Sequence, residues 1–205
     1  MKLLPLVAAL VAVSAVVLPS FRPALSAPDA KGTIDMLDNA LLDVMKNADK
    51  LGYKGRYEKL GPVIEQAFNL PLMARISVGP QWSSLTADQQ NKIAEAFKSL
   101  SVATYASRFD GYGGEQFKIV GEAPTTGSDD LVNTTMVRPN DDPVDLNYRL
   151  RQENGSWKII DVFLSGTISQ LANYRSEFAA TLRANGADGL VALINQKVSD
   201  LVPKG

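Results

Sequence analysis

The 205-residue chain is long enough to form one domain with a sizeable core. Its 21 lysine and arginine residues nearly balance its 22 aspartate and glutamate residues, so no strong field is available to attract nucleic acid. The lack of histidine and cysteine excludes imidazole bases, thiolate nucleophiles, disulfides and metal sites built from these ligands. Most hydrolase and transferase mechanisms are thereby excluded.

The N-terminal residues have the pattern of a secretory signal. One lysine precedes an almost wholly apolar run over residues 3–18, and small residues follow at 24–27. Because cleavage after Ala27 would leave Pro28 next to the cut, we predict a signal peptide over residues 1–26. The alternative is an uncleaved membrane anchor, but the apolar run is shorter than the ~20 residues that span a bilayer. We therefore expect an exported protein, and the lack of cysteine excludes a lipoprotein anchor.

The first half of the mature chain is predicted to be helical. Apolar periodicity and breakers indicate helices over residues 34–51, 61–68, 70–78 and 86–107. Gly52 is expected to end the first helix, and Pro62 and Pro71 suit the first turns of the next two. Thr86 and Gln89 have the spacing of a capping box for the fourth helix.

Four strands are predicted next. Runs of β-branched and aromatic residues indicate strands over residues 116–122, 131–138, 144–151 and 157–164. Apolar and polar residues alternate in the third strand, so one face of it should be buried and the other wet. Asn154-Gly155 favours a tight hairpin turn before the last strand. The strands are expected to form an antiparallel meander.

Two helices are expected after the sheet. Thr167 and Gln170 have the spacing of a capping box for the first of them, and Gly186 is expected to end it. Asp188 is expected to cap the second. The apolar residues predicted to share one face of the first helix are Ile168, Leu171, Phe178 and Leu182.

The order of these elements predicts an α+β fold. We expect a curved four-stranded antiparallel sheet of the NTF2-like type, packed by helices, with additional N-terminal helices. Residues 27–205 should form a single domain. Its mainly helical part is predicted at 27–110, and its sheet and C-terminal helices at 111–205.

Several short motifs resemble a known protein family. They are Leu51-Gly52-Tyr53, Met73-Ala-Arg75, Tyr105 to Asp110, Trp157 to Val162, Tyr174-Arg175 and Gly186 to Leu190. The pattern resembles the toluene-tolerance, or MlaC-like, family of periplasmic lipid-binding proteins, and within it the hopanoid-associated HpnM branch. The similarity extends over nearly the whole mature chain, and none of these motifs is a catalytic signature.

The resemblance implies a soluble periplasmic lipid carrier that is not an enzyme. Such a carrier holds phospholipid acyl chains or a hopanoid in an apolar cavity and shuttles this lipid between inner- and outer-membrane transport machinery. The implied partners are the lipid and membrane-embedded transporter components, with no nucleic acid and no cofactor. We expect a monomer.

Eleven residues are candidates to line a lipid-binding cavity between the sheet and the helices. They are Phe97, Leu100, Tyr105, Tyr112, Phe117, Met136, Leu146, Tyr148, Phe163, Leu171 and Phe178. The alternative for each of them is that it only fills the core. A strongly curved sheet allows either arrangement, so the pattern leaves both open.

An enzyme on the same scaffold is the main alternative. Asp161, predicted to face the same way as Ile159 and Phe163, is the one candidate base, with Tyr148 or Tyr112 as proton handlers. The competing interpretation of Asp161 is a salt bridge with an arginine or a contact that caps the following helix. We predict no metal site.

A periplasmic adaptor without a ligand is the remaining alternative. Such a protein would dock on a transporter through its helix surface. For either a carrier or an adaptor, a positively charged docking surface is predicted around Arg56, Lys59, Arg75 and Arg175.

Overall fold

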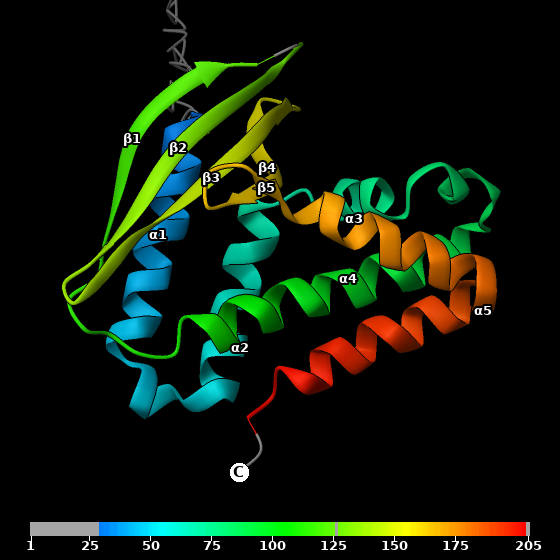
Figure 1. The fold of residues 1–205 in the computed structure, drawn as a ribbon, viewed down its shortest axis with the longest axis horizontal. Coiled ribbons are helices and arrows are strands. Elements are labelled where there is room, and N and C mark those ends of the chain that lie inside the picture. Colours follow the sequence, from blue (N-terminus) through cyan, green and yellow to red (C-terminus); the bar gives the residue numbers. More distant parts are fainter. Residues whose placement is uncertain (1–28, 126, 204–205) are drawn as a thin grey trace, which may run out of the picture.

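The computed structural model describes residues 29–125 and 127–203, so the predicted signal peptide lies outside the described residues. Helices come first, the sheet next and a long helix last (Figure 1). The helices are α1 (Ala30–Lys46), α2 (Ala48–Ala67), α3 (Leu70–Val78), the 3-10 helix η1 (Gly79–Ser84), α4 (Ala87–Arg108) and α5 (Gln170–Asp200). The strands are β1 (Gln116–Pro124), β2 (Asp129–Arg138), β3 (Asp141–Glu153), β4 (Ser156–Leu164) and β5 (Ile168–Ser169).

The predicted antiparallel meander is confirmed. The strands pair in the order β1-β2-β3-β4-β5, and the two-residue β5 is an addition to the four predicted strands. Asn154 and Gly155 have φ values of 49° and 79°, as the tight turn between β3 and β4 requires. The sheet is curved and open, and the mixed helix and antiparallel sheet architecture confirms the α+β fold class.

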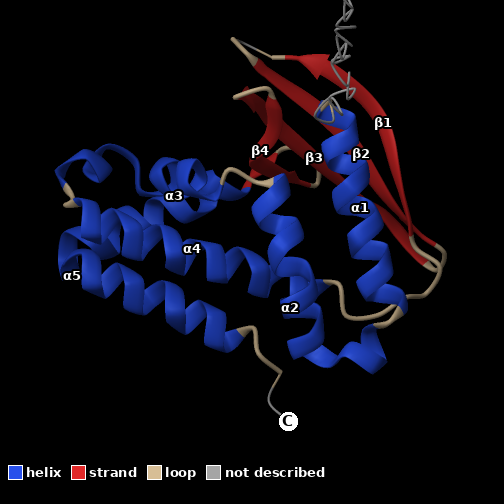
Figure 2. Cartoon of the chain, turned by 180° about the vertical axis from the view of Figure 1, so that it is seen from behind, coloured by secondary structure: helices blue, strands red, loops and turns tan. Residues whose placement is uncertain are grey.

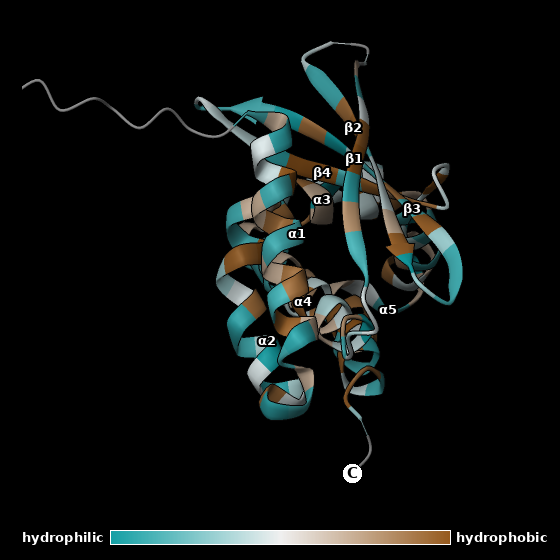
Figure 3. Cartoon of the chain, turned by 90° about the vertical axis from the view of Figure 1, so that its left-hand side faces the viewer, coloured by the Kyte–Doolittle hydropathy of each residue, from teal (hydrophilic) through white to brown (hydrophobic). Residues whose placement is uncertain are grey.

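The helices form a layer against the sheet. Figure 2 shows α1 beside the sheet, and α4 and α5 side by side at the other end of the molecule. Hydrophilic and hydrophobic residues alternate along α1, as expected of a helix with one buried face (Figure 3). Among the described residues, none of the helices has the length and hydropathy needed to cross a bilayer.

The N-terminal helix boundaries differ from the prediction. The first helix ends at Lys46, and α2 runs through both Gly52 and Pro62. Gly52 has φ 58° and ψ −177°, which lie outside the helical region, so it interrupts the helical geometry as predicted and divides α2 into two segments that meet at a kink. The segment between the two breakers has little apolar periodicity and was therefore missed, but Leu60 anchors it in the core. Tertiary burial outweighs the weak local signal here.

The start of α5 also differs from the prediction. Ser165 and Gly166 adopt positive φ values of 50° and 74° and turn the chain back onto β4, so Ile168 pairs as part of β5. Ser169 is the N-cap, and its Oγ accepts a hydrogen bond from the N–H of Ala172 at 3.0 Å. The capping box proposed for Thr167 and Gln170 is therefore wrong, and Ile168 is half exposed.

Of the other predicted helix caps, the one at Thr86 is confirmed and the one at Asp188 is wrong. Thr86 and Gln89 form the expected capping box, with 2.9 Å between the Thr86 N and the Gln89 Oε1. Gly186 has φ 67° and breaks the helical geometry of α5, which reverses direction there (Figure 1). Asp188 lies inside the helical segment that resumes after Gly186 and is not its N-cap.

A bulge in β4 decides which of its residues face the helices. Asp161 pairs with Arg149 and Ile159 pairs with Leu150, so Ile160 has no partner on β3. The extra residue shifts the alternation by one position. As a result, Ile159 shares a face with the buried Leu150, whereas Asp161 shares the opposite face with Arg149.

Candidate functional site

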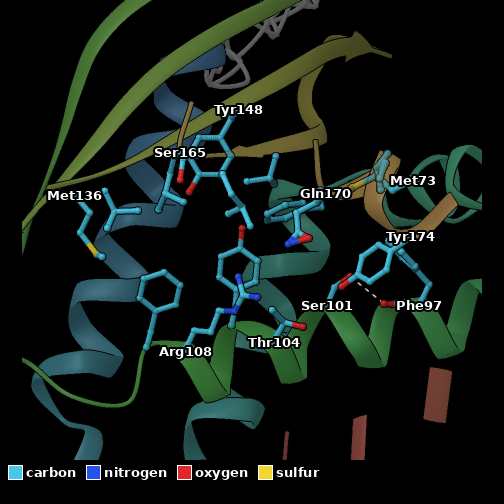
Figure 4. A pocket seen from close by; sticks show the side chains of 18 residues that line it. Met73, Phe97, Ser101, Thr104, Arg108, Met136, Tyr148, Ser165, Gln170 and Tyr174 are labelled. Carbon is cyan, nitrogen blue, oxygen red and sulfur yellow. Dashed lines mark hydrogen bonds between the residues drawn. The ribbon is translucent and has the colours of Figure 1, made fainter. Parts of the chain in front are cut away.

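A cavity of about 330 Å³ lies between the sheet and helices α3, α4 and α5 (Figure 4). Most of its lining is apolar. The lining residues are Phe68, Met73, Phe97, Ser101, Thr104, Tyr105, Arg108, Phe109, Met136, Val144, Leu146, Tyr148, Val162, Leu164, Ser165, Gln170, Leu171 and Tyr174. Such a space suits an apolar molecule or an apolar part of one.

Helix α4 contributes one continuous face to the cavity. The lining residues of α4 recur at intervals of three or four residues, and they are Phe97, Ser101, Thr104, Tyr105 and Arg108. Figure 4 shows Phe97, Ser101, Thr104 and Arg108 along the side of α4 that faces the cavity. The Ser101 hydroxyl donates to the carbonyl of Phe97 at 2.9 Å, and the Thr104 hydroxyl donates to the carbonyl one turn earlier at 2.7 Å. Because these hydroxyls are already bonded within the helix, this part of the wall behaves as largely apolar.

Aromatic contacts hold the cavity walls in place. The rings of Phe97 and Tyr174 pack edge to face with centroids 6.0 Å apart, which joins α4 to α5. Tyr105 packs against both Phe68 and Phe109, with centroids 5.6 Å apart in each pair. Such pairs stabilise the fold beyond their buried area and restrict the movement of the rings. The cavity is therefore bounded by side chains with few alternative positions.

Three side chains with titratable groups, Asp38, Tyr105 and Tyr148, are buried in this region. Burial raises the pKa of both Tyr105 and Tyr148. Burial also raises the pKa of Asp38 on α1 to about 7, assisted by repulsion from Asp35. The Asp38 Oδ1 has no hydrogen-bond partner among the described residues. Both tyrosines are neutral at physiological pH, so they add no charge to the wall.

Six of the eleven predicted residues surround the cavity. These six are Phe97, Tyr105, Met136, Leu146, Tyr148 and Leu171. They come from α4, from β2 and β3, and from the first turn of α5. Their positions agree with the predicted location between sheet and helices, and a role in binding remains a prediction.

The other five predicted residues lie elsewhere. Leu100 and Phe178 are buried in the helical core, and Phe117 packs against Phe109 with centroids 6.1 Å apart. Tyr112 is exposed, with the Lys46 Nζ 5.2 Å from its ring centroid.

Phe163 and Asp161 are placed on the outer face of the sheet by the bulge in β4. Phe163 pairs with Asn147, whereas Val162 pairs with Tyr148 on the cavity side. Asp161 and Phe163 share a face as predicted, but the prediction is wrong for Ile159, which lies on the opposite face. Neither Asp161 nor Phe163 lines the cavity.

Twelve further lining residues were missed. Those on α4 and β3 follow directly from periodicity, because Ser101, Thr104 and Arg108 extend the helical face of Phe97 and Val144 lies two residues before Leu146. Those on β4 were hidden by the bulge. Tyr174 also follows from periodicity, because it lies three residues after Leu171, whereas Gln170 was hidden by the misplaced start of α5.

The structure contradicts one of the four residues predicted for the positive docking surface and gives two others partners within the protein. Arg56 is only 6% exposed, and its Nε donates to the carbonyl of Ala106 at 2.8 Å. Lys59 forms an ion pair with Asp43. The guanidinium of Arg175 donates to a backbone carbonyl on α3 at 3.1 Å. Arg75 is exposed.

No cluster of three or more acidic residues able to hold a metal ion occurs within residues 29–125 and 127–203. The fold and cavity define an α+β protein with an apolar cavity between an antiparallel sheet and the helices that cover it. A family model described as "MlaC protein" matches residues 35–196, so the chain belongs to the MlaC family.

Two relatives support this assignment. The chain is 23% identical over 171 residues to the intermembrane phospholipid transport system binding protein MlaC of Haemophilus influenzae. The matched segment covers 79% of this chain and 78% of the Haemophilus protein. Its fold is similar to the structure of a phospholipid-binding protein from Ralstonia solanacearum in complex with a phospholipid, with a TM-score of 0.72 and 26% identity. That similarity covers 86% of this chain and 100% of the Ralstonia chain.

Proposed function

We propose that this protein is a periplasmic lipid carrier that holds phospholipid acyl chains in its cavity. It moves the lipid between transport machinery of the inner and outer membranes and acts as a monomer. The observation that carries the proposal is the apolar cavity of about 330 Å³ between the sheet and α3, α4 and α5. Membership of the MlaC family, and the phospholipid bound to the Ralstonia relative, support the choice of ligand.

The size of the cavity suits one acyl chain or a large part of one. A cavity of about 150 Å³ holds a benzene molecule, so about 330 Å³ accommodates roughly 13 carbon atoms. Transfer of each methylene from water contributes about 0.8 kcal/mol, which amounts to roughly 10 kcal/mol before ordering costs. This free energy is large enough to keep a lipid bound without a strong contact to its head group.

The same volume favours an acyl chain over a hopanoid. A hopanoid is a rigid fused-ring molecule that cannot bend to follow the aromatic walls, whereas an acyl chain can. A phospholipid is therefore the preferred ligand, and assignment to the hopanoid-associated HpnM branch remains a prediction. A hopanoid as the main bound lipid would require the cavity to widen.

An enzymatic role has little support from the geometry. Asp161, the candidate base, lies on the outer face of β4, while Tyr148 lies beside the cavity. We infer that the protein is not an enzyme and needs no cofactor. The adaptor alternative does not account for the apolar cavity.

Lipid extraction from the natively produced protein tests the proposal. The protein is purified from its own periplasm without detergent, and the extract is analysed by mass spectrometry. We expect phospholipid in a reproducible molar ratio, and a bound fluorescent fatty-acid probe should be displaced by added phospholipid. Lipid-free protein that also fails to bind the probe would refute the carrier function.

N-terminal sequencing of the same sample should give a start near Ala27 if the signal peptide is cleaved as predicted.

A further inference from the structure

Arg108 is the one charged residue among the described residues that line the cavity. It lies in the last turn of α4 and is exposed. Phe97, on the same helix face about three turns earlier, is only 2% exposed. Figure 4 shows the two residues at opposite ends of the row that α4 presents to the cavity. Arg108 therefore marks the end of this row that is open to solvent.

The guanidinium of Arg108 has no ion-pair partner among the described residues. Other arginines differ in this respect, because Arg149 and Arg151 both pair with Asp129, and Arg56 donates to a backbone carbonyl. A guanidinium carries five N–H donors in a planar fork. In Arg108 these donors are available to a ligand.

The charge of Arg108 acts on the tyrosines of the cavity wall. Burial raises the pKa of Tyr174, and the positive charge of Arg108 opposes that rise. Burial also raises the pKa of Tyr105, and the charge of Arg108 again opposes this rise. The guanidinium is therefore close enough to the cavity to interact with a charged group at its mouth.

The distance from Phe97 to Arg108 can be compared with the length of acyl chain that the cavity holds. Phe97 and Arg108 are eleven positions apart on α4, which corresponds to about 16 Å at a rise of 1.5 Å per residue. The volume accommodates roughly 13 carbon atoms. A chain that lies along α4 with its methyl end near Phe97 would thus place its polar end near Arg108.

We propose that Arg108 binds the phosphate of a phospholipid whose acyl chain lies in the cavity, an inference that rests on the proposed carrier function. A guanidinium can donate two parallel hydrogen bonds to phosphate oxygens, which fixes orientation as well as charge. Arg108 thereby selects a lipid with an anionic phosphate over a neutral lipid with the same chains, and it sets the direction in which the chain enters.

The test compares two ligands and two matched variants. Binding of short-chain phosphatidylglycerol, and of diacylglycerol with the same chains, is measured by calorimetry at low salt below the critical micelle concentration. For Arg108→Gln we expect about a tenfold loss of affinity for phosphatidylglycerol and no change for diacylglycerol. Arg183→Gln removes the same charge from an exposed site on α5 outside the cavity lining, and it should change neither affinity. Arg108→Lys should keep part of the preference as a point charge.

The outcomes separate this inference from the proposed function. If Arg108→Gln weakens both ligands equally, or weakens neither, the phosphate contact is refuted while the carrier function stands. Failure of the unmodified protein to bind either lipid would refute both. Because the Arg108 side chain is exposed, added salt should reduce the preference for phosphatidylglycerol, and a salt-independent preference would also contradict the proposal. Circular dichroism verifies that each variant is folded.

Discussion

The carboxylate of Asp161 on β4 accepts a hydrogen bond from the hydroxyl of Ser169, with 2.6 Å between Oδ2 and Oγ. The Asp161 Oδ1 also accepts from the N–H of Leu171 in the first turn of α5, at 3.3 Å. Ser169 is itself the N-cap of α5. Asp161 therefore positions the start of the helix that supplies Leu171 and Tyr174 to the cavity.

Replacement of Asp161 by Asn should affect stability and leave ligand binding intact. The amide keeps the shape, but it has one accepting oxygen where the carboxylate has two, and it has no negative charge. We therefore expect a loss of about 1–2 kcal/mol in the free energy of unfolding. Urea denaturation measures this loss. Asp142→Asn, at an exposed carboxylate in β3, should stay within about 0.5 kcal/mol of the unmodified protein. An Asp161→Asn variant of normal stability that has lost its cellular function would instead support the enzyme alternative.

Filling the cavity should abolish lipid binding. Val144 lines the cavity, so the larger ring in Val144→Trp occupies space that the acyl chain would take, at an overpacking cost of about 1–3 kcal/mol. Val120→Trp makes the same change at a site on β1 that is 63% exposed and outside the lining. Mass spectrometry of the purified proteins should find lipid with Val120→Trp and little with Val144→Trp. Equal lipid content in both folded variants would contradict the location of the binding site.

Asp38 should make the protein less stable as the pH rises. Its pKa is raised to about 7 in the folded protein by burial and by repulsion from Asp35, while the unfolded chain has a value near 3.9. The native state therefore binds more protons between these values, so this group lowers the free energy of unfolding as the pH rises from about 4 to 7. The cost at pH 8 is at most about 4 kcal/mol.

Asp38→Asn should remove most of this dependence. We expect the variant to be more stable than the unmodified protein at pH 8 and of similar stability at pH 4.5, as measured by urea denaturation at each pH. Asp35→Asn, an exposed change on the same helix, removes only the smaller repulsive contribution and should have a weaker effect. If Asp38→Asn destabilises the protein at pH 8, the carboxylate must have a favourable partner and the burial argument fails.

Asp129 should have the opposite pH dependence. Hydrogen bonds and charge from Arg151 and Arg149 hold its pKa below the usual value. The stability that it contributes is present at neutral pH and is lost as the pH falls below about 4. Asp129→Asn should cost about 1–3 kcal/mol at pH 7, since it leaves two guanidinium groups, whose side chains are 36% and 35% exposed, without their partner. The cost measured by urea denaturation should shrink at pH 3, and a cost that does not depend on pH would exclude the ion pairs as its cause.

Features with local causes were predicted well from the sequence. The capping box of Thr86 and Gln89 and the turn at Asn154-Gly155 depend on residues within a few positions of one another. The alternation in β3 predicted the buried face that carries Leu146 and Tyr148. These patterns are sufficient because a single residue type or a short spacing decides the backbone conformation.

Features that depend on distant partners were not predicted. The burial of Arg56 requires the carbonyl of Ala106, which lies 50 residues away on another helix. The bulge at Ile160 moves Asp161 and Phe163 to the outer face of the sheet. No local pattern of apolar residues marks such a bulge.

By itself, the sequence determined the α+β fold class and excluded thiol and imidazole chemistry, because composition, periodicity and turn residues act locally or on the whole chain at once. Only the tertiary structure decided which apolar side chains surround a cavity and which fill the core. Phe97 and Leu100 illustrate the difference, since both are apolar residues of α4, and only the direction in which each points separates the cavity wall from the interior. That direction depends on how α4 packs against the sheet, and the bulge at Ile160 decides which residues of β4 face the helices.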